Sequence, residues 1–356
     1  MDTVRFGIIG LHNHYHAYPM ADYLKRGISN AKLVAVSDER DAYAESFAAR
    51  YGIDGSYTDY RRLLDRKDVD AVIVTSYTTA HAEHVRACAE AGKHILLDKP
   101  ISASMEDAWG IVADVQKNKV KLMMAYLLRF IPAYRKAKQL IVEGVIGAPV
   151  SAVYSIRVPL GFIKDSPDAQ VPGWYADPSR GGRGGFMDHG VHFTDFFRWM
   201  FESEAKTVFG RIANLTYKDV PVEDYGIAVI TLESGAICTV ESTWHAADWY
   251  FPDKCTITGT EGEIEFHYQK SPQLEVAGNR APYIGRLHFD WKGEERYEVC
   301  YRAIVEEFAD CIINDKAPVP DAADGARALE MILGAYQSHE RNKAIDLPLQ
   351  GGGRTE

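Results

Sequence analysis

The chain has 356 residues, a length for which we expect two domains. Its formal net charge is −10 at pH 7. We therefore expect no nucleic-acid partner, because binding phosphates needs a clustered basic surface. It contains no apolar run long enough to span a membrane and no signal-peptide pattern at its N-terminus, which indicates a cytoplasmic protein. The five cysteines are odd in number, widely spaced and without a C-x-x-C pair, which is typical of free thiols rather than of disulfides or a zinc site: Cys88, Cys238, Cys255, Cys300 and Cys311.

The first 125 residues alternate between short apolar runs and amphipathic segments. The runs are too continuous for half-exposed strands, so they predict central strands covered on both faces: Phe6–Ile9, Leu33–Val36, Ala71–Val74, His94–Leu97 and Leu122–Ala125. Between them, Ala80–Ala91 ends at Gly92 and Ser104–Lys117 begins with a residue suited to an N-cap, as helices do. This order predicts an α/β fold whose N-terminal domain, residues 1–125, is a Rossmann domain with a doubly wound parallel sheet.

The stretch GIIGLHNHYH, residues 7–16, follows the first predicted strand and lies where a dinucleotide-binding turn belongs. Of the pattern G-x-G-x-x-G it keeps Gly10, whereas His12 and Tyr15 replace the second and third glycines. Gly10 still permits the tight turn, but a side chain at position 12 obstructs a close approach of the backbone to a pyrophosphate. We expect imidazole donors from His12 or His14 to replace those backbone contacts.

The same loop also permits a different interpretation, a metal site made of His12, His14 and His16. His12 and His16 have the H-x-x-x-H spacing, yet no acidic residue or cysteine lies nearby in the sequence to complete the site. The amide of Asn13 adds a further donor suited to phosphate. We therefore expect a cofactor loop and no metal.

The second predicted strand ends in VAVSDER, which places Asp38 just beyond its last residue. A carboxylate there accepts hydrogen bonds from both ribose hydroxyls and repels a 2′-phosphate. Asp38 therefore predicts NAD rather than NADP, a choice that Arg40 can soften. The alternative is an ordinary surface turn, in which Asp is common.

The pattern changes after residue 125. A helix at Ala133–Glu143, a glycine-rich loop at Gly181–Gly185 and a helix through Asp195–Met200 are expected. Extended stretches and two closing helices follow: Tyr225–Leu232, Ala236–Trp244, Lys254–Thr258, Glu263–His267, Tyr301–Asn314 and Ala322–His339. With turns at Gly235 and Gly262, this predicts a C-terminal α+β domain, residues 126–350, with a large, mainly antiparallel open sheet, and a disordered tail at residues 351–356.

Two stretches, AGKHILLDKPIS and GGRGGFMDHGVHFTDFFRWM, resemble the Gfo/Idh/MocA family of NAD(P)-dependent sugar and polyol oxidoreductases. The Glu-Lys-Pro turn of that family is matched by Asp98, Lys99 and Pro100. Its pattern close to G-G-G-x-x-x-D-x-G-x-H-x-x-D is met by four residues: Asp188, Gly190, His192 and Asp195. Weaker matches, among them LRFIPAYRKAKQLIVEGVIGAP, VEDYG and GTEGEIEF, extend the resemblance over nearly the full length.

The resemblance implies roles that the chemistry supports. Oxidation of a secondary alcohol needs a base for the hydroxyl proton, and an imidazole such as His192 has an ordinary pKa near neutrality. Lys99 would hydrogen-bond the reacting oxygen and stabilise its charge. Asp188 lies one helical turn before His192, where it can orient the imidazole or bind substrate hydroxyls.

Two groups of binding residues complete these expectations. The cofactor contacts are expected to be Gly10, His12, Asn13, His14, Asp38, Ser76, His81 and Lys99. The substrate contacts are expected to be Lys99, Arg129, Trp174, Asp188, His192, Asp195 and His245. The chain departs from the family at Leu127, where an asparagine is usual near the nicotinamide, and at Tyr175, which replaces an arginine.

These residues predict an NAD-dependent dehydrogenase that acts on a CH–OH group of a sugar, a sugar derivative or a cyclic polyol. Two alternatives remain open: an enzyme that cleaves glycosides through transient oxidation, and a non-catalytic regulator that senses a sugar or NAD. A homodimer or homotetramer formed through the C-terminal sheet is expected, because an open sheet usually has its exposed face covered.

Overall fold

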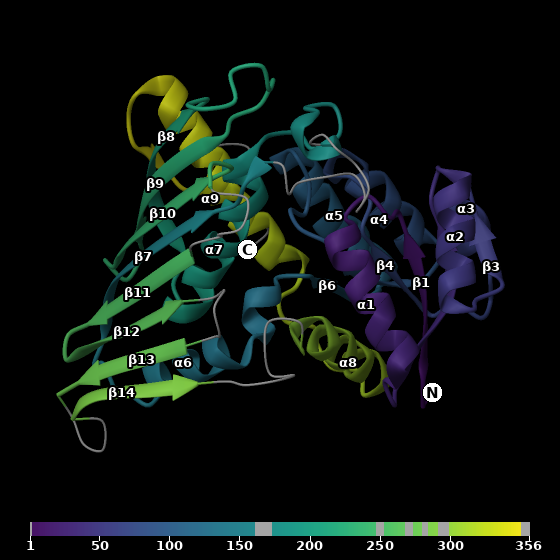
Figure 1. The fold of residues 1–356 in the computed structure, drawn as a ribbon, viewed down its shortest axis with the longest axis horizontal. Coiled ribbons are helices and arrows are strands. Elements are labelled where there is room, and N and C mark those ends of the chain that lie inside the picture. The colour runs from purple at the N-terminus through teal and green to yellow at the C-terminus, as the bar shows by residue number, and fades with distance from the viewer. Residues whose placement is uncertain are drawn as a thin grey trace. The chain divides into compact units, whose positions relative to one another are not determined.

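The computed structural model describes residues 2–160, 173–246, 253–267, 273–279, 284–290 and 299–349, so the expected tail at 351–356 lies outside the described residues. The chain divides into two compact units (Figure 1). We call residues 2–126, 173–182 and 301–326 the Rossmann unit, and the remaining described residues the sheet unit. Among the helices of these ranges, none is both long and apolar enough to cross a membrane.

The Rossmann unit contains a six-stranded sheet with the strand order β3-β2-β1-β4-β5-β6, in which every neighbouring pair is parallel. Its strands are β1 (Val4–Ile9), β2 (Ala31–Ser37), β3 (Gly55–Tyr57), β4 (Ala71–Val74), β5 (His94–Leu97) and β6 (Leu122–Met124). This is the order of dinucleotide-binding folds, so the predicted doubly wound sheet is confirmed. The strand missed in the sequence is β3, because Gly-Ser-Tyr offers no apolar run and pairs only with β2.

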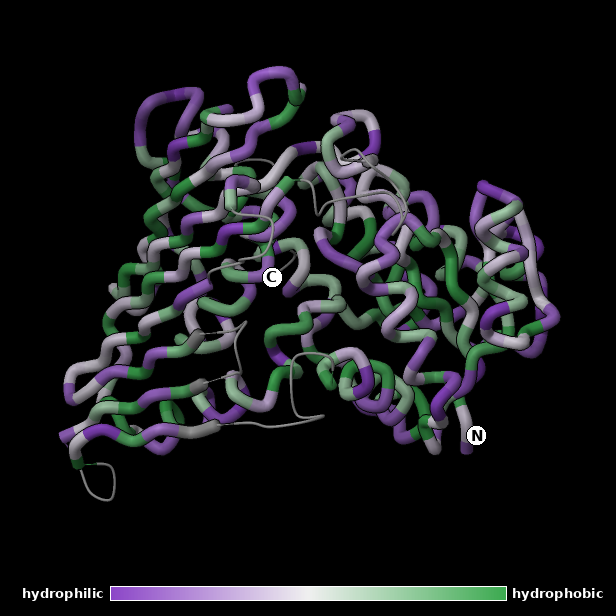
Figure 2. Tube along the Cα trace, in the orientation of Figure 1, coloured by the Kyte–Doolittle hydropathy of each residue, from purple (hydrophilic) through white to green (hydrophobic). Residues whose placement is uncertain are grey.

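Helices connect these strands: α1 (His14–Gly27), α2 (Asp41–Tyr51), α3 (Tyr60–Leu64), α4 (His81–Glu90) and α5 (Met105–Asn118). The predicted cap of α5 is present, since Ser104 Oγ accepts a hydrogen bond from Asp107 N at 3.1 Å. All four residues of β4 are fully buried, and green, hydrophobic stretches run through the middle of this unit in Figure 2. Burial on both faces explains why their apolar runs do not alternate.

Helix α8 (Val299–Ile313) belongs with the Rossmann unit from Tyr301 onwards, whereas the sequence interpretation placed it in the C-terminal domain. The rings of Phe6 and Phe308 are 6.3 Å apart, and Asn30 Nδ2 donates to Glu306 O at 3.3 Å. Position along the chain could not reveal this, because the apolar face of an amphipathic helix does not specify its partner.

The sheet unit contains nine strands in the order β14-β13-β12-β11-β7-β10-β9-β8-β15. They are β7 (Pro149–Arg157), β8 (Ala205–Ala213), β9 (Tyr225–Leu232), β10 (Ile237–Thr243), β11 (Asp253–Gly259), β12 (Gly262–His267), β13 (Gln273–Gly278), β14 (Gly285–Asp290) and β15 (Ile345–Asp346). Only the β7–β10 pair is parallel among these neighbours. The predicted open, mainly antiparallel sheet is therefore confirmed.

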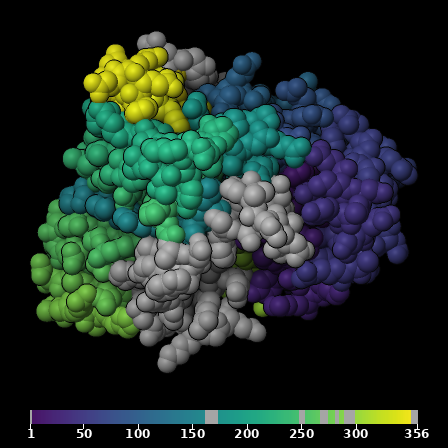
Figure 3. All heavy atoms as spheres, turned by 45° about the horizontal axis from the view of Figure 1, so that its top comes forward, coloured from purple at the N-terminus to yellow at the C-terminus, as the bar shows by residue number. Residues whose placement is uncertain are grey.

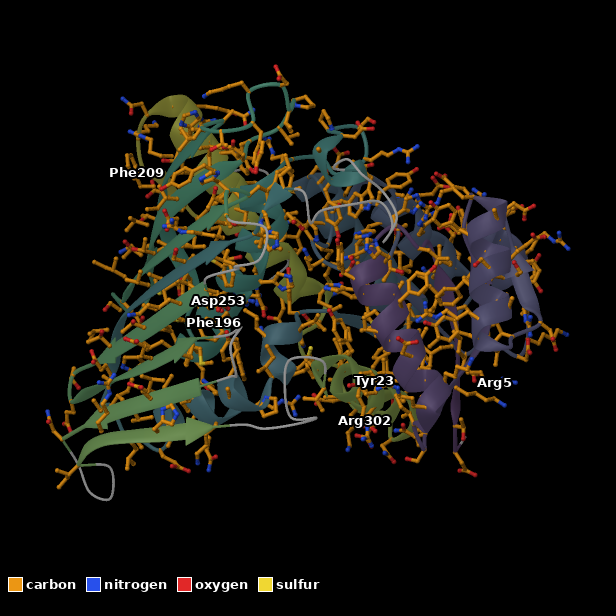
Figure 4. All side chains as sticks on the ribbon, in the orientation of Figure 1. Arg5, Tyr23, Phe196, Phe209, Asp253 and Arg302 are labelled. Carbon is orange, nitrogen blue, oxygen red and sulfur yellow. The ribbon has the colours of Figure 1, made fainter. Side chains whose placement is uncertain are left out.

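One face of this sheet is covered by helices α6 (Pro132–Val142), α7 (Gly185–Phe201) and α9 (Ala322–Arg341). An aromatic cluster lies between α6, α7 and the strands, and Phe196 is labelled in Figure 4: Tyr134, Tyr154, Phe193, Phe196 and Phe266. The strand β15 lies against β8, with Ile345 paired to Val208, and in Figure 3 the yellow residues near the C-terminus lie beside teal residues. The core of the unit thus lies between the helices and one face of the sheet.

Candidate functional site

The opening loop makes its tight turn with one glycine. Gly10 has φ +79°, and a Cβ at this position would lie 2.5 Å from Ser76 Cα, so no other residue fits. Asn13 N donates to Thr75 O at 3.0 Å, and Thr75 Oγ1 donates to Gly10 O at 2.5 Å. These bonds hold the loop against the end of β4, and α1 begins at His14.

His12 occupies the position of the second glycine, and its side chain is only 4% exposed. Neither ring nitrogen has a hydrogen-bond partner within the described part of the chain. The nearest acidic atoms are Asp38 Oδ2, 3.9 Å from Nδ1, and Glu39 Oε1, 3.6 Å from Nε2. Burial lowers the pKa of His12, although Asp38 opposes this shift, so the ring is neutral at pH 7. Buried polar atoms without partners are rare, and here they fit a cofactor's ribose or phosphate groups.

Asn13 and His16 contact the carboxylate that follows β5. Asn13 Nδ2 donates to Asp98 Oδ2 at 2.5 Å, His16 Nδ1 lies 2.6 Å from Asp98 Oδ1, and Lys99 N donates to that same oxygen at 2.8 Å. Burial raises the pKa of Asp98, but its interactions with His16, together with the nearby Lys99 and His81, outweigh this and lower it. An acidic residue thus lies beside these residues in space, although none does in sequence.

The loop histidines do not share the geometry that the metal interpretation needs. His12 precedes α1, so His12 and His16 are not one helical turn apart. His14 is buried against Tyr15, with ring centroids 3.9 Å apart. The described residues contain no group of three or more His, Cys, Asp or Glu side chains that could hold a metal ion.

Ser76 and His81 follow β4 and were both expected to contact the cofactor. Ser76 Oγ lies 2.8 Å from His84 Nδ1. His81 is fully buried, with Nδ1 2.9 Å from Pro100 O and Nε2 3.1 Å from Ser76 O. The structure therefore gives His81 a positioning role, in which it ties the segment after β4 to the Lys99–Pro100 turn.

Helix α7 begins at Gly185, ten residues before the helix that the sequence predicted at Asp195. Glu223 explains the difference: its carboxylate accepts hydrogen bonds from Gly184 N at 2.9 Å and Phe186 N at 3.1 Å, and also from Tyr336 OH. A carboxylate at a helix N-terminus stabilises the free N–H groups there. The VEDYG match contains this residue, but a cap 38 residues away cannot be inferred from local pattern.

The early start of α7 places Asp188, His189 and His192 on one continuous helix. Asp188 Oδ2 lies 3.1 Å from His189 Nδ1, and both histidines are partly exposed. His189 was missed, although its adjacency to Asp188 in the sequence was a usable signal. The first two turns of the helix thus carry one carboxylate and two imidazoles, which suits proton transfer and hydroxyl binding.

Arg129 and Asp195, both expected to bind substrate, bind each other. Arg129 Nε and Nη2 donate to Asp195 Oδ2 and Oδ1 at 2.8 and 2.6 Å, and the carboxylate is fully buried. This bidentate pair links the short helix Leu127–Phe130 to α7. Each oxygen of Asp195 thus already accepts from a protein cation, and substrate binding by Arg129 or Asp195 stays a prediction.

The two remaining expected substrate contacts have different surroundings. Trp174 is buried in the Rossmann unit, where Nε1 donates to His12 O at 3.0 Å and the ring stacks on Tyr175 at 3.8 Å. Trp174 thus supports the opening loop and is not an open stacking surface. His245 is exposed, and its backbone N donates to Thr243 Oγ1 at 3.1 Å.

Comparison with known families decides what these two units are. Residues 4–126 match the model of the oxidoreductase family with an NAD-binding Rossmann fold, and residues 134–265 match the GFO/IDH/MocA C-terminal domain. The chain belongs to the Gfo/Idh/MocA family. The predicted family, the NAD cofactor and an oxidoreductase acting on CH–OH are thereby confirmed.

Curated relatives align over nearly the whole chain. One is scyllo-inositol 2-dehydrogenase (NAD(+)) of Bacillus subtilis (strain 168), 28% identical over 98% of this chain and 97% of the relative. Another is myo-inositol 2-dehydrogenase of Thermotoga maritima, 26% identical over 97% and 98%. Among solved structures, levoglucosan dehydrogenase in complex with NADH and levoglucosan has a TM-score of 0.86 and 25% identity, covering 97% of this chain and 99% of that one.

Proposed function

We propose that the chain is a dehydrogenase that transfers a hydride between a secondary alcohol of a cyclic polyol, a sugar or a sugar derivative and NAD. The observation that carries the proposal is helix α7, which presents Asp188 beside His189 and holds His192 one turn further on. Two full-length relatives named as inositol dehydrogenases favour a cyclic polyol among these substrates.

NAD supplies the hydride acceptor when bound, and Gly10, His12 and the Asp38 region are the residues that would hold it. His192 accepts the hydroxyl proton, since imidazole has an ordinary pKa near neutrality. Asp188, held beside His189, binds a neighbouring substrate hydroxyl. Lys99 donates a hydrogen bond to the reacting oxygen and stabilises its negative charge.

The position of Lys99 has a structural basis within the Rossmann unit. Its backbone N–H donates to Asp98, whose carboxylate also binds Asn13 and His16 of the cofactor loop. Asn13 and His16, which flank the start of α1, are therefore connected through Asp98 to the turn that carries the proposed catalytic lysine. We assign Asp98 a positioning role.

The proposal is tested with the full-length chain, NAD and a panel of cyclic polyols, free sugars and glycosides, followed by NADH absorbance and product analysis. Formation of NADH with a free polyol or sugar, strongly reduced in His192→Ala and retained in His339→Ala, supports it. His339 is an exposed histidine near the end of α9 and serves as the matched control. Glycoside cleavage without net NADH, or ligand binding without any turnover, contradicts it in favour of the two alternatives.

We also infer that a second copy of the chain covers the outer face of the nine-stranded sheet. Strand register places Phe209, Val229, Thr239 and Val153 in one row across β8, β9, β10 and β7, and the three apolar members are exposed. Phe209 is labelled in Figure 4. Contiguous apolar residues on a sheet face mark an interface.

A neighbouring row on the same face contains Arg211, Glu241 and Lys254. Because this row carries both signs of charge, a two-fold related copy can pair its charges with itself. Light scattering is expected to give a dimer or tetramer, and Val153→Lys is expected to shift it toward the monomer. A monomeric wild-type chain at micromolar concentration would refute the interface. A cytoplasmic location remains part of this proposal.

A further inference from the structure

The carboxylate of Asp38, at the end of β2, has its acceptor positions filled by the protein itself. Oδ2 accepts from Leu11 N at 2.7 Å and Arg40 Nη2 at 2.9 Å, and Oδ1 accepts from Arg40 N at 3.0 Å and Arg40 Nε at 2.7 Å. A carboxylate offers about four lone-pair sites. These four bonds therefore leave no acceptor for the two ribose hydroxyls that an aspartate at this position usually binds.

The four bonds differ in how readily they can be exchanged. Two come from backbone N–H groups, one in the tight turn after Gly10 and one before α2, so breaking them would disrupt the loop. The other two come from the guanidinium of Arg40, whose side chain is 24% exposed, whereas the Asp38 side chain is fully buried. Only the guanidinium can move away without unfolding the site.

The contacts of Arg40 hold its guanidinium in place. The guanidinium carbon lies 4.0 Å from the centroid of the Tyr43 ring, a cation–π contact that supports the bidentate pair. Burial raises the pKa of Asp38, but the hydrogen bond from Arg40 and the other interactions outweigh this and lower it. Glu39, about half exposed, is the neighbouring group that opposes an incoming phosphate.

We infer that Arg40 is the residue that sets cofactor choice in this chain. Its guanidinium competes with the ribose hydroxyls of NAD for Asp38, and the same cation can bind a 2′-phosphate if it turns outward. This competition weakens the binding of NAD. The Arg40 guanidinium also offsets the repulsion that the carboxylates of Asp38 and Glu39 exert on the 2′-phosphate of NADP. The chain therefore binds both NAD and NADP, with only a modest difference between the two affinities. This inference rests on the proposed function only in placing NAD at Asp38.

The test measures binding and not turnover. Calorimetric titration of the full-length chain with NAD and NADP gives the ratio of the two affinities. Titration with AMP and adenosine 2′,5′-bisphosphate measures the contribution of the adenosine half of each dinucleotide. Arg40→Ala is expected to raise the affinity for NAD and to lower the affinity for NADP. Each change should be about tenfold, which is the effect of one charge-assisted hydrogen bond. The bisphosphate is expected to follow NADP, and AMP to follow NAD.

Matched variants separate this role from a general loss of charge. Arg50→Ala removes an arginine from α2, the helix that Arg40 precedes; Arg50 also lies beside an acidic residue and a tyrosine ring. This variant is expected to leave the ratio of NAD to NADP affinity unchanged. Arg40→Gln keeps the length of the side chain without the charge and is expected to behave as Arg40→Ala. In an Asp38→Asn background, Arg40→Ala is expected to bring no gain in NAD affinity.

Three results would overturn the assignment. The first is an unchanged NAD-to-NADP ratio in both Arg40 variants, and the second is an equal change in Arg50→Ala. The third is a gain in NAD affinity that persists in the Asp38→Asn background. If the wild-type chain bound neither dinucleotide nor either adenosine probe, the proposed function would fail together with this inference. Binding with an unchanged ratio would refute the role of Arg40 alone.

Discussion

Each unit contains an aspartate beside a histidine, and the two pairs have different surroundings. Asp98 and His16 are 82 residues apart in the chain, 2.6 Å apart in space, and 1% and 7% exposed. Asp188 and His189 are neighbours in the chain, 3.1 Å apart, and 8% and 18% exposed. The same residue types thus form one pair that is almost wholly buried and one that is more exposed.

The difference teaches how to assign a role to such a pair. Asp98 accepts hydrogen bonds from Asn13, His16 and the backbone of Lys99, so it joins three parts of the Rossmann unit. Asp188 and His189 lie on one helix, and their pairing joins no separate segments. We therefore expect changes at Asp98 to affect stability and the position of Lys99, and changes on α7 to affect chemistry.

The largest expected effect is on turnover. His192→Ala and Lys99→Ala should each lower kcat by about 10²–10⁴, the range of positioned acid–base groups. If both act at one transition state, the double variant should be little worse than the poorer single variant. Steady-state kinetics with the substrate found in the screen would measure this. Additive losses would show that the two residues do not act together.

The same variants make a prediction about pH. The kcat/KM for oxidation should rise with pH through one group near neutrality, since the base must be deprotonated, and His192→Ala should lose that limb. NAD affinity should stay unchanged in His192→Ala. A variant with near-normal turnover and the same profile would place the proton acceptor elsewhere.

The second expected effect is on stability. Asp98→Asn should lower the free energy of unfolding by about 3–5 kcal/mol, because it breaks a buried charged pair, whereas Asp188→Asn should cost about 1 kcal/mol. Urea denaturation of both variants measures the contrast. Equal losses would remove the distinction between the two pairs, and Asp98→Glu, the residue usual in the family, should recover part of the loss.

The acid side of the stability profile sharpens the same contrast. The pKa of Asp98 is lower in the folded chain than its ordinary value near 4. Its contribution to stability is therefore complete above that ordinary value and is lost as the pH falls through the folded value. In Asp98→Asn, the free energy of unfolding should therefore fall less steeply as the pH is lowered. Urea midpoints measured between neutral and acidic pH would show this.

The smallest expected effect concerns His12. His12→Phe removes two buried nitrogens that lack hydrogen-bond partners in the described structure, so stability should stay equal or rise slightly. NAD affinity should fall by about 1–2 kcal/mol if the ring binds the cofactor. Thermal unfolding and calorimetric titration measure the two changes. Unchanged NAD affinity would show that the loop binds the cofactor through backbone groups alone.

The sequence by itself determined much of the fold. The buried runs that became β1, β2, β4, β5 and β6 are visible because strand segments covered on both faces are mostly apolar. Gly10, the Asp-Lys-Pro turn and the DHGVH stretch were found for a related reason, because each places special chemistry within a few consecutive residues. The strand β3 was missed because its three residues carry no such signal.

Only the tertiary structure decided which polar residues are available. Asp195 accepts hydrogen bonds from Arg129, which is 66 residues away in the chain. Asp38 accepts hydrogen bonds from Arg40 and from Leu11 N, and Glu223 accepts one from Gly184 N at the start of α7. In each case a charged group meets its partner through folding. A local pattern specifies which atoms can donate or accept, but burial and long-range pairing determine which of them are already satisfied.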